Sequence, residues 1–175
     1  MPVFFDVETQ NTFQEVGGRY PERLKISVAV TFDTADNAFH RYLEADAAQL
    51  AQDLGQADLV VGYNLYGFDY PVLQQYSQGI ELAELPTVDM MVEIQKRLGF
   101  RLKLDSIATA TLQVGKSADG LQAVRWWREG RVEEILEYCQ QDVEVTRRIY
   151  EFGKQFRYIQ YYDRQYRIKR VAVAW

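Results

Sequence analysis

The chain contains a single cysteine, Cys139, and a single histidine, His40, among its 175 residues. One cysteine excludes an intrachain disulfide and a cysteine-based zinc site. Such sparing use of cysteine fits a reducing compartment, and we expect a cytoplasmic protein. Serine–histidine hydrolysis is not indicated either, because no G-x-S-x-G motif accompanies the histidine. We expect His40 to be structural or exposed.

Long apolar runs are also missing from the sequence. No stretch approaches the roughly 20 apolar residues of a membrane-spanning helix, so we expect no membrane partner. The N-terminal segment MPVFFDVET has no basic region and reaches an acid at position 6, which is not typical of a signal peptide. The tripeptide GKS at 115–117 belongs to no P-loop, since Ala110 stands where the motif needs glycine.

The chain lacks an overall basic character, because its net charge is −5. That charge is uneven: 154–175 has six Lys or Arg and one acid, giving +5, which leaves −10 on 1–153. A nonspecific nucleic-acid coat is therefore excluded. A protein of this charge that handles nucleic acid needs basic patches or bound cations to offset its carboxylates. The basic C-terminal segment is most simply a pair of solvated strands.

The apolar patterns predict strands first and helices later. VFFDVET, LKISVAVTF and AFHRYL predict three strands in a meander, and ADLVVGYN predicts a buried fourth strand. The second half predicts helices, the longest being VEEILEYCQQDVEVTRRIYEFG, followed by a closing β-hairpin. With 47% hydrophobic residues and no linker, we expect one α/β domain over 1–175, with a central mixed sheet flanked by helices.

Two carboxylates, Asp6 and Glu8, stand one residue apart in the segment FFDVETQ. On a strand, positions i and i+2 share a face and lie roughly 6.5–7 Å apart. Bare carboxylates at that distance repel by roughly 2.5 kcal/mol at an effective dielectric of about 20. A hard divalent cation such as Mg²⁺ offsets this repulsion. Read alone, however, the motif fits a solvated strand end better.

A third acid follows the next buried strand, in the segment NLYGFD. Asn64 ends the expected strand, and Phe68 and Asp69 open a helix. Ligand sites in α/β sheets favour such strand ends. An alternative is that Asp69 complements the helix macrodipole and that Asn64 only terminates the strand.

A fourth acid lies in the longest predicted helix, in the segment YCQQD. Tyr138 and Asp142 are i and i+4 and share a face, and Asp142 borders the apolar stripe of this helix. A carboxylate beside a buried stripe is costly unless it is paired or metal-bound. The alternative is a tyrosine packed at the core edge beside an exposed Asp142. Cys139 points roughly 100° away from Tyr138, and we expect it to be a core thiol.

In this order, D-x-E, N-x-x-x-F-D and Y-x-x-x-D, the chain resembles the DEDD superfamily of 3′–5′ exonucleases, which have a ribonuclease-H-like three-layer fold. The tyrosine of the third motif resembles that of the DEDDy branch, which includes proofreading domains of DNA polymerases. The segments LDSIATATL and YCQQDVEVT look most similar to stand-alone or helicase-associated bacterial exonuclease domains. The resemblance covers essentially the whole chain.

The resemblance implies a role for each motif residue. Asp6, Glu8, Asp69 and Asp142 match four acids that hold two Mg²⁺ or Mn²⁺ ions, with Asp6 bridging both. Glu8 and Asp142 would complete the site of the ion that carries the attacking water, and Asp69 would hold the second ion through water. Tyr138 would orient the attacking water. We expect the strand to place its acids at an edge of the sheet, facing the late helix.

Four residues are predicted to bind substrate. Asn64 and Phe68 resemble positions that line the terminal-nucleotide site of the family. Tyr20, in the loop GGRY, has a ring that can stack on a base, although a plain flexible loop is an equally good interpretation. Lys116 is a candidate phosphate contact or an ordinary surface lysine.

The resemblance implies a two-metal-dependent 3′–5′ exonuclease that acts on the 3′ end of single-stranded DNA or RNA, with DNA favoured, and releases nucleoside monophosphates. One alternative is a catalytically inactive ribonuclease-H-like module that binds nucleic acid or a protein partner. Another is an endonuclease on the same fold. The complete set of four acids and Tyr138 favours the exonuclease. No sequence feature specifies an oligomer, and a monomer is compatible with the sequence.

Overall fold

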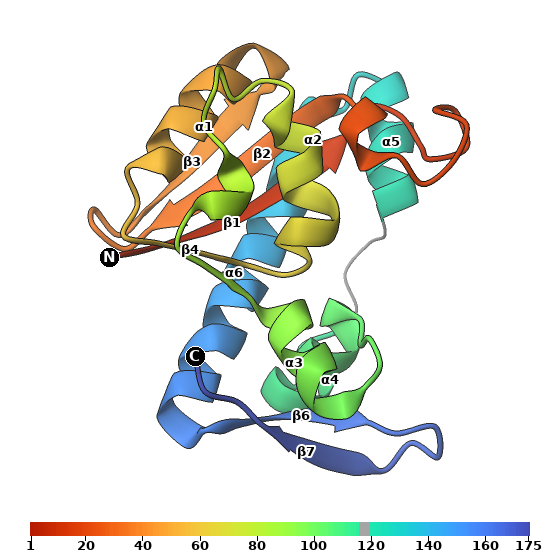
Figure 1. The fold of residues 1–175 in the computed structure, drawn as a ribbon. Coiled ribbons are helices and arrows are strands. Elements are labelled where there is room, and N and C mark those ends of the chain that lie inside the picture. Colours follow the sequence, from red (N-terminus) through yellow and green to blue (C-terminus); the bar gives the residue numbers. More distant parts are fainter. Residues whose placement is uncertain (116–119) are drawn as a thin grey trace.

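The computed structural model describes residues 1–115 and 120–175 (Figure 1). Lys116, which the sequence suggested as a phosphate contact, lies outside the described residues. None of the described helices is both long and apolar enough to cross a bilayer.

A five-stranded mixed sheet with strand order β3-β2-β1-β4-β5 forms the centre of the molecule. β2 runs antiparallel to both β1 and β3, which confirms the predicted meander, whereas β4 lies parallel to β1 and β5. The strand β1, which we expected to place its acids at an edge of the sheet, is the central strand, with β2 on one side and β4 on the other. The strands are β1 (Pro2–Thr9), β2 (Ile26–Asp33), β3 (Ala38–Leu43), β4 (Leu59–Gly62) and β5 (Thr87–Asp89).

Helices cover both faces of this sheet, as the three-layer prediction requires (Figure 1). Two of them lie on one face, and the longest, the predicted late helix, lies on the other. The helices are α1 (Ala47–Gly55), α2 (Tyr70–Gln74), α3 (Met90–Leu98), α4 (Leu104–Leu112), α5 (Gly120–Arg128) and α6 (Val132–Phe156). The fold is α/β and ribonuclease-H-like.

Alternation along β1 decides which side chains face which layer. Val3, Phe5 and Val7 are buried in the core beneath α1 and α2. Phe4 is buried in the other core, which α6 covers. Since every second residue of a strand shares a face, Asp6 and Glu8 lie on the α6 side with Phe4. The carboxylates therefore face the long helix.

The chain closes with the predicted hairpin, formed by β6 (Tyr158–Tyr162) and β7 (Ile168–Ala172). Ile159 and Val171 are buried in the α6 core. Thr111 of α4 bonds to the backbone of Gln160 twice, donating to its carbonyl at 3.0 Å and accepting from its amide at 2.9 Å. These contacts fix the hairpin against α4, at the end of α6 away from β3 (Figure 1).

Three local features differ from the sequence predictions. The helix expected to open at Phe68 and Asp69 begins at Tyr70 and ends at Gln74, because the Gln74 side-chain amide donates to Ser77 and to the Ile80 carbonyl and stabilises a turn there. Before that helix stands a single π-helical turn, Leu65–Asp69. The strand β5 was not predicted, since three residues carry too little pattern to be recognised.

Candidate functional site

Three carboxylates converge between β1 and α6. Asp6, Glu8 and Asp142 each place an oxygen within 4.8 Å of the other two, the only such group of potential metal ligands among residues 1–115 and 120–175. At that separation, two full charges repel by about 3.5 kcal/mol at an effective dielectric of about 20. The cluster is therefore stable only when protons or a cation offset its charge.

Burial sets the protonation of these acids. It raises the pKa of Asp6 well above its usual value, and the charge of Asp142 raises it further. Burial likewise raises the pKa of Glu8, with Asp6 as the next cause and Asp142 after it. A divalent cation reverses this balance because it favours the ionised form of each carboxylate it binds.

Asp69 lies beside the cluster rather than in it. Only 2% of Asp69 is exposed, and its Oδ1 accepts a hydrogen bond from the backbone amide of Val7 at 3.0 Å. The pairing of β4 with β1 reaches only Phe4, so this amide has no partner in that strand. Burial, then the charge of Asp6, raises the pKa of Asp69. All four predicted acids are thus brought together, three of them tightly.

Cys139 contacts the cluster as well, which the sequence did not reveal. Its thiol is fully buried and donates to the Asp6 carboxylate oxygen Oδ2 and to the Asp6 carbonyl, both at 3.4 Å. The core position expected for Cys139 is confirmed, but the contact with Asp6 was missed. The available signal was its i, i+3 spacing from Asp142, which places both on one side of the helix.

Tyr138 also reaches the acids from α6. Its ring packs edge-to-face against Trp126 of α5, with centroids 6.3 Å apart. Burial raises the pKa of Tyr138 far above its ordinary value, and the charges of Glu8 and Asp142 raise it further. The phenol is consequently neutral at any physiological pH, so it acts as a hydrogen-bonding group and not as a base.

A groove of about 520 Å³ opens beside the carboxylates; it is called the site groove below. Its lining includes Asp6, Glu8 and Asp69. The remainder is mostly apolar or aromatic and includes Phe13, Phe68 and Leu121. The rings of Phe13 and Phe68 meet edge-to-face at 6.0 Å. A groove of this size, lined by both acids and aromatic rings, suits a flat polar ligand with a phosphate.

The predicted substrate residues divide between this groove and other places. Asn64 and Phe68 line the groove, whereas Tyr20 does not. The Tyr20 ring instead lies under the guanidinium of Arg23, 4.2 Å away. Phe13 and Leu121 line the groove without having been predicted. Phe13 follows Glu8 in the loop after β1, and that proximity was the only signal in the sequence.

Asn64 has two unusual features. Its backbone is left-handed, with φ of 73°, and its side-chain Oδ1 is buried without a hydrogen bond to the described chain. A Cβ atom at Gly67 would lie 2.4 Å from that oxygen, so only glycine fits there. The side-chain oxygen of Asn64 is thus a buried acceptor packed against Gly67, on a residue that lines the groove.

Comparisons with known proteins agree with this geometry. The family model of the RNase H superfamily matches residues 3–152. The chain belongs to the RNase H superfamily. Among solved structures, the family B DNA polymerase of the hyperthermophilic archaeon Pyrobaculum calidifontis is similar, with a TM-score of 0.66 and 19% identity. The match covers 89% of this chain and 24% of the polymerase chain, and it shows the shared fold.

No curated protein matches this RNase H superfamily member in sequence. Membership in the superfamily supports nuclease activity in general, and RNase H-like nucleases use divalent metal ions. The cluster of Asp6, Glu8 and Asp142 fits such an ion, since it offers only carboxylate oxygens, the ligands that Mg²⁺ and Mn²⁺ prefer. The charge repulsion within the cluster also requires a cation when the acids are ionised.

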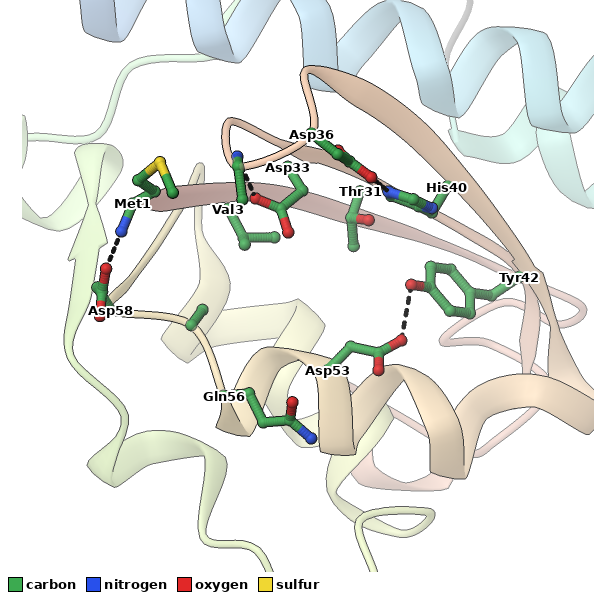
Figure 2. Close-up of a pocket in the computed structure, with 12 residues that line it drawn as sticks. Met1, Val3, Thr31, Asp33, Asp36, His40, Tyr42, Asp53, Gln56 and Asp58 are labelled. Carbon is green, nitrogen blue, oxygen red and sulfur yellow. Dashed lines mark hydrogen bonds and ion pairs between the residues drawn. The ribbon is translucent and has the colours of Figure 1, made fainter.

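A second acidic pocket of this RNase H domain lies at the other end of β1 and has a different character (Figure 2). It has about 480 Å³ and is lined by acids that the chain itself satisfies. Tyr42 donates to Asp53 at 2.9 Å, His40 bonds to Asp36 at 2.9 Å, and the N-terminal amine pairs with Asp58. His40 is partly exposed and lines this pocket rather than the site groove, in line with its expected structural or exposed role. We assign no role in hydrolysis to this pocket.

Proposed function

We propose that this RNase H superfamily member is a 3′–5′ exonuclease that depends on two divalent cations, Mg²⁺ or Mn²⁺. Its substrate is the 3′ end of single-stranded nucleic acid, with DNA favoured, and its product is a nucleoside monophosphate. One observation carries the proposal: three carboxylates lie within 4.8 Å of one another, and a neutral tyrosine reaches them from the turn before Asp142.

In this proposal the chain's own acids hold the two cations. Asp6, Glu8 and Asp142 would bind one ion, and Asp6 with Asp69 would bind the other. When bound, the ions activate water and neutralise the charge of the phosphate and of the leaving oxygen. The hydrogen bond from Val7 holds the carboxylate of Asp69 in place through Oδ1, at the groove beside Asp6 and Glu8.

Hydrolysis forms a bond between a water oxygen and phosphorus and breaks the bond from phosphorus to the 3′ oxygen of the preceding nucleotide. Tyr138 fits the task of orienting that water, because its neutral hydroxyl both donates and accepts hydrogen bonds. The departing 3′ oxygen gains a proton, and the released nucleotide retains its 5′ phosphate. A shortened strand with a free 3′ hydroxyl remains.

The site groove supplies the contacts for the terminal nucleotide. Phe13 and Phe68 offer aromatic surface for a base, and stacking on rings does not depend on base identity. Asn64 also lines this groove, and an amide side chain both donates and accepts hydrogen bonds. An enzyme that removes whatever nucleotide stands at the end needs this kind of tolerant recognition.

The test uses 5′-labelled single-stranded DNA and RNA with Mg²⁺, Mn²⁺ or EDTA. We expect a ladder of products shortened from the 3′ end, dependent on metal and absent in Asp6→Asn and Asp142→Asn. Asp36→Asn is the matched control, because Asp36 is an acid of the second pocket. Equal degradation by the cluster variants and the intact chain, or none with either metal, would contradict the proposal.

A circular single strand separates the proposed exonuclease from the two alternatives. It has no 3′ end, so an exonuclease leaves it intact while it shortens the linear strand. Cleavage of the circle indicates an endonuclease on the same fold. Binding of both strands without hydrolysis indicates an inactive nucleic-acid-binding module.

A further inference from the structure

The carboxylate cluster opens onto more than the site groove. A second groove of about 500 Å³, the loop groove, shares Asp6 and Asn64 with the site and is otherwise lined largely by the α3–α4 connection, including Arg101 and Lys103. The Tyr63 hydroxyl donates to the Leu102 carbonyl at 2.7 Å and holds this connection beside the site. The path from the acids thus leads directly to two basic side chains.

A third groove continues this path to the C-terminal hairpin. This hairpin groove, of about 560 Å³, is lined by Phe100, Arg101 and Leu102 on one side and by the end of β6 and the following turn, 161–165, on the other. Arg101 and Leu102 line both the loop groove and the hairpin groove. The hairpin lies directly against α3 and α4 (Figure 1), so the path runs over one continuous surface.

The charges along this path are mostly uncompensated. In the part of the chain that the structure describes, Lys103 and Arg164 form no ion pair, and Arg101 bonds only to the neutral amide of Gln95. The one acid of the hairpin, Asp163, is already engaged by Arg167 at 2.9 Å. The path is therefore basic on a molecule whose first 153 residues carry −10.

Aromatic rings alternate with these cations. Phe100 is 49% exposed and meets the Tyr161 ring edge-to-face at 6.3 Å. Tyr166, at the hairpin tip, is 88% exposed. Rings interleaved with Lys and Arg along a groove are the combination by which proteins bind single-stranded nucleic acid, through base stacking and phosphate contacts.

Stability of the fold does not explain these side chains. The hairpin is held by Ile159 and Val171 in the core and by the Thr111–Gln160 bonds, whereas Phe100 and Arg164 are exposed. An exposed phenylalanine in a loop gains little from folding. Phe100 lies beside Arg101, whose charge no acid offsets, on the path that leads to the acids. This combination is typical of a surface that binds a ligand.

We propose that the loop groove and the hairpin groove together bind the part of a single-stranded substrate that lies 5′ of the scissile phosphate. This inference rests on the proposed function. If the 3′-terminal nucleotide occupies the site groove, the rest of the strand must leave the acids on its 5′ side. The basic and aromatic path through Arg101 to Arg164 gives that strand the phosphate and base contacts it needs.

Binding of oligonucleotides tests this inference separately from hydrolysis. All proteins carry Asp142→Asn, so that a strand survives in Mg²⁺, and fluorescence anisotropy gives the dissociation constant. We expect Phe100→Ala with Arg164→Ala to weaken binding of a single strand of about 15 nucleotides roughly tenfold, as loss of a stacking platform and a phosphate contact does. Binding of a dinucleotide, which places a single nucleotide beyond the scissile phosphate and leaves the hairpin groove empty, stays within about twofold.

Two controls keep the result specific. Arg148→Ala removes an exposed cation of α6 that lines neither groove, and we expect a change of less than about twofold. Arg164→Lys keeps the charge and should retain most of the affinity. In the Arg164→Ala protein, the slope of log affinity against log salt should fall by about 0.7, the value for one cation on a single strand.

The inference is overturned if the double variant binds the long strand as tightly as its parent. It is equally overturned if Arg148→Ala or the dinucleotide shows the same loss. Failure of the proposed function has a different signature, because the intact chain would then give no metal-dependent 3′ ladder or would also cleave the circular strand. The binding measurement still decides whether the path holds nucleic acid in that case.

Discussion

At the scale of single residues, Tyr138 and Cys139 show how adjacent positions on a helix serve one site differently. Tyr138 reaches the acids with a neutral hydroxyl, whereas the Cys139 thiol bonds to Asp6 from within the core. Neither side chain belongs to the group of potential metal ligands, Asp6, Glu8 and Asp142. We propose that Tyr138 orients water and that Cys139 positions the Asp6 carboxylate.

Tyr138→Phe tests the first of these roles. The change removes one hydroxyl and keeps the ring contact with Trp126. We expect kcat to fall by about tenfold to a hundredfold, since a misplaced water reacts slowly. The Mn²⁺ dissociation constant, measured by calorimetry, should stay within about twofold because the carboxylates are untouched. Tyr42→Phe, in the second pocket, is the control, and equal turnover in the two variants would remove Tyr138 from the mechanism.

Cys139→Ala tests the second role, in which the thiol positions the carboxylate of Asp6. Its loss frees that carboxylate to rotate, and removal of a group that orients a metal ligand typically weakens metal affinity by about tenfold or more. We expect weaker Mn²⁺ binding for Cys139→Ala and recovery in Cys139→Ser, which restores a donor of similar size. A purely structural role for Cys139 would lower the melting temperature of both variants and leave the Mn²⁺ affinity unchanged.

At the scale of elements, periodicity explains which parts of the fold were predictable. The 25 residues of α6 and the eight of β2 repeat their apolar pattern often enough to be recognised. The three residues of β5 and the π-turn Leu65–Asp69 do not. That turn depends on a side chain from a distant part of the chain, Asp89, so no local pattern could have predicted it.

Asp89 joins two elements of the site through one buried carboxylate. It caps α3 by accepting from the amides of Met91 and Val92. It also accepts from the amides of Asn64 and Tyr66, across the turn that leads to Asp69. Four backbone donors thus rely on a side chain that is 2% exposed.

Asp89→Ala should accordingly cost more than an ordinary helix cap. Loss of a cap costs about 1 kcal/mol, and buried donors left without partners add about 1–3 kcal/mol. We expect a loss of about 3 kcal/mol in the free energy of unfolding by urea, with a smaller loss for Asp89→Asn. The exposed Asp36→Ala should stay within about 0.5 kcal/mol. A loss for Asp89→Ala no larger than that would show that its bonds to the Asn64 turn contribute nothing.

At the scale of the whole molecule, motifs far apart in sequence predicted the acidic cluster because their order matched a known family. Asp6 and Asp142 are separated by 136 positions, and only the fold brings their oxygens within 4.8 Å. The groove was less predictable. Phe13 and Leu121 enter it from a loop and from α5, whose positions depend on packing rather than on any local pattern.

The same cluster sets the stability of the whole chain without metal. Asp6, Glu8 and Asp69 have raised pKa values in the fold, chiefly through burial. A group whose pKa is raised binds its proton more tightly in the folded state than in the unfolded state. Its stabilising effect is complete below the ordinary value near 4 and is lost as pH rises through the raised value. Glu15 and Asp163 are exposed acids with lowered pKa values, so they stabilise the folded state as pH rises, but only near pH 4. Their contribution is small because solvent screens their interactions.

We therefore expect the metal-free chain to melt at a lower temperature at pH 8 than at pH 5. Mn²⁺ should reverse the order, because it binds ionised carboxylates and so stabilises most where they are ionised.

Glu8→Gln removes one buried charge, and it should raise the melting temperature in EDTA at pH 8 while abolishing the response to Mn²⁺. Each kcal/mol gained is worth about 2–4 °C for a chain of this length. A metal-free melting temperature that rises steadily from pH 5 to pH 8, in the intact chain and the variant alike, would show that the cluster carries no such repulsion. The proposed metal ligands would then not destabilise the metal-free fold, and a cation would have no repulsion to offset.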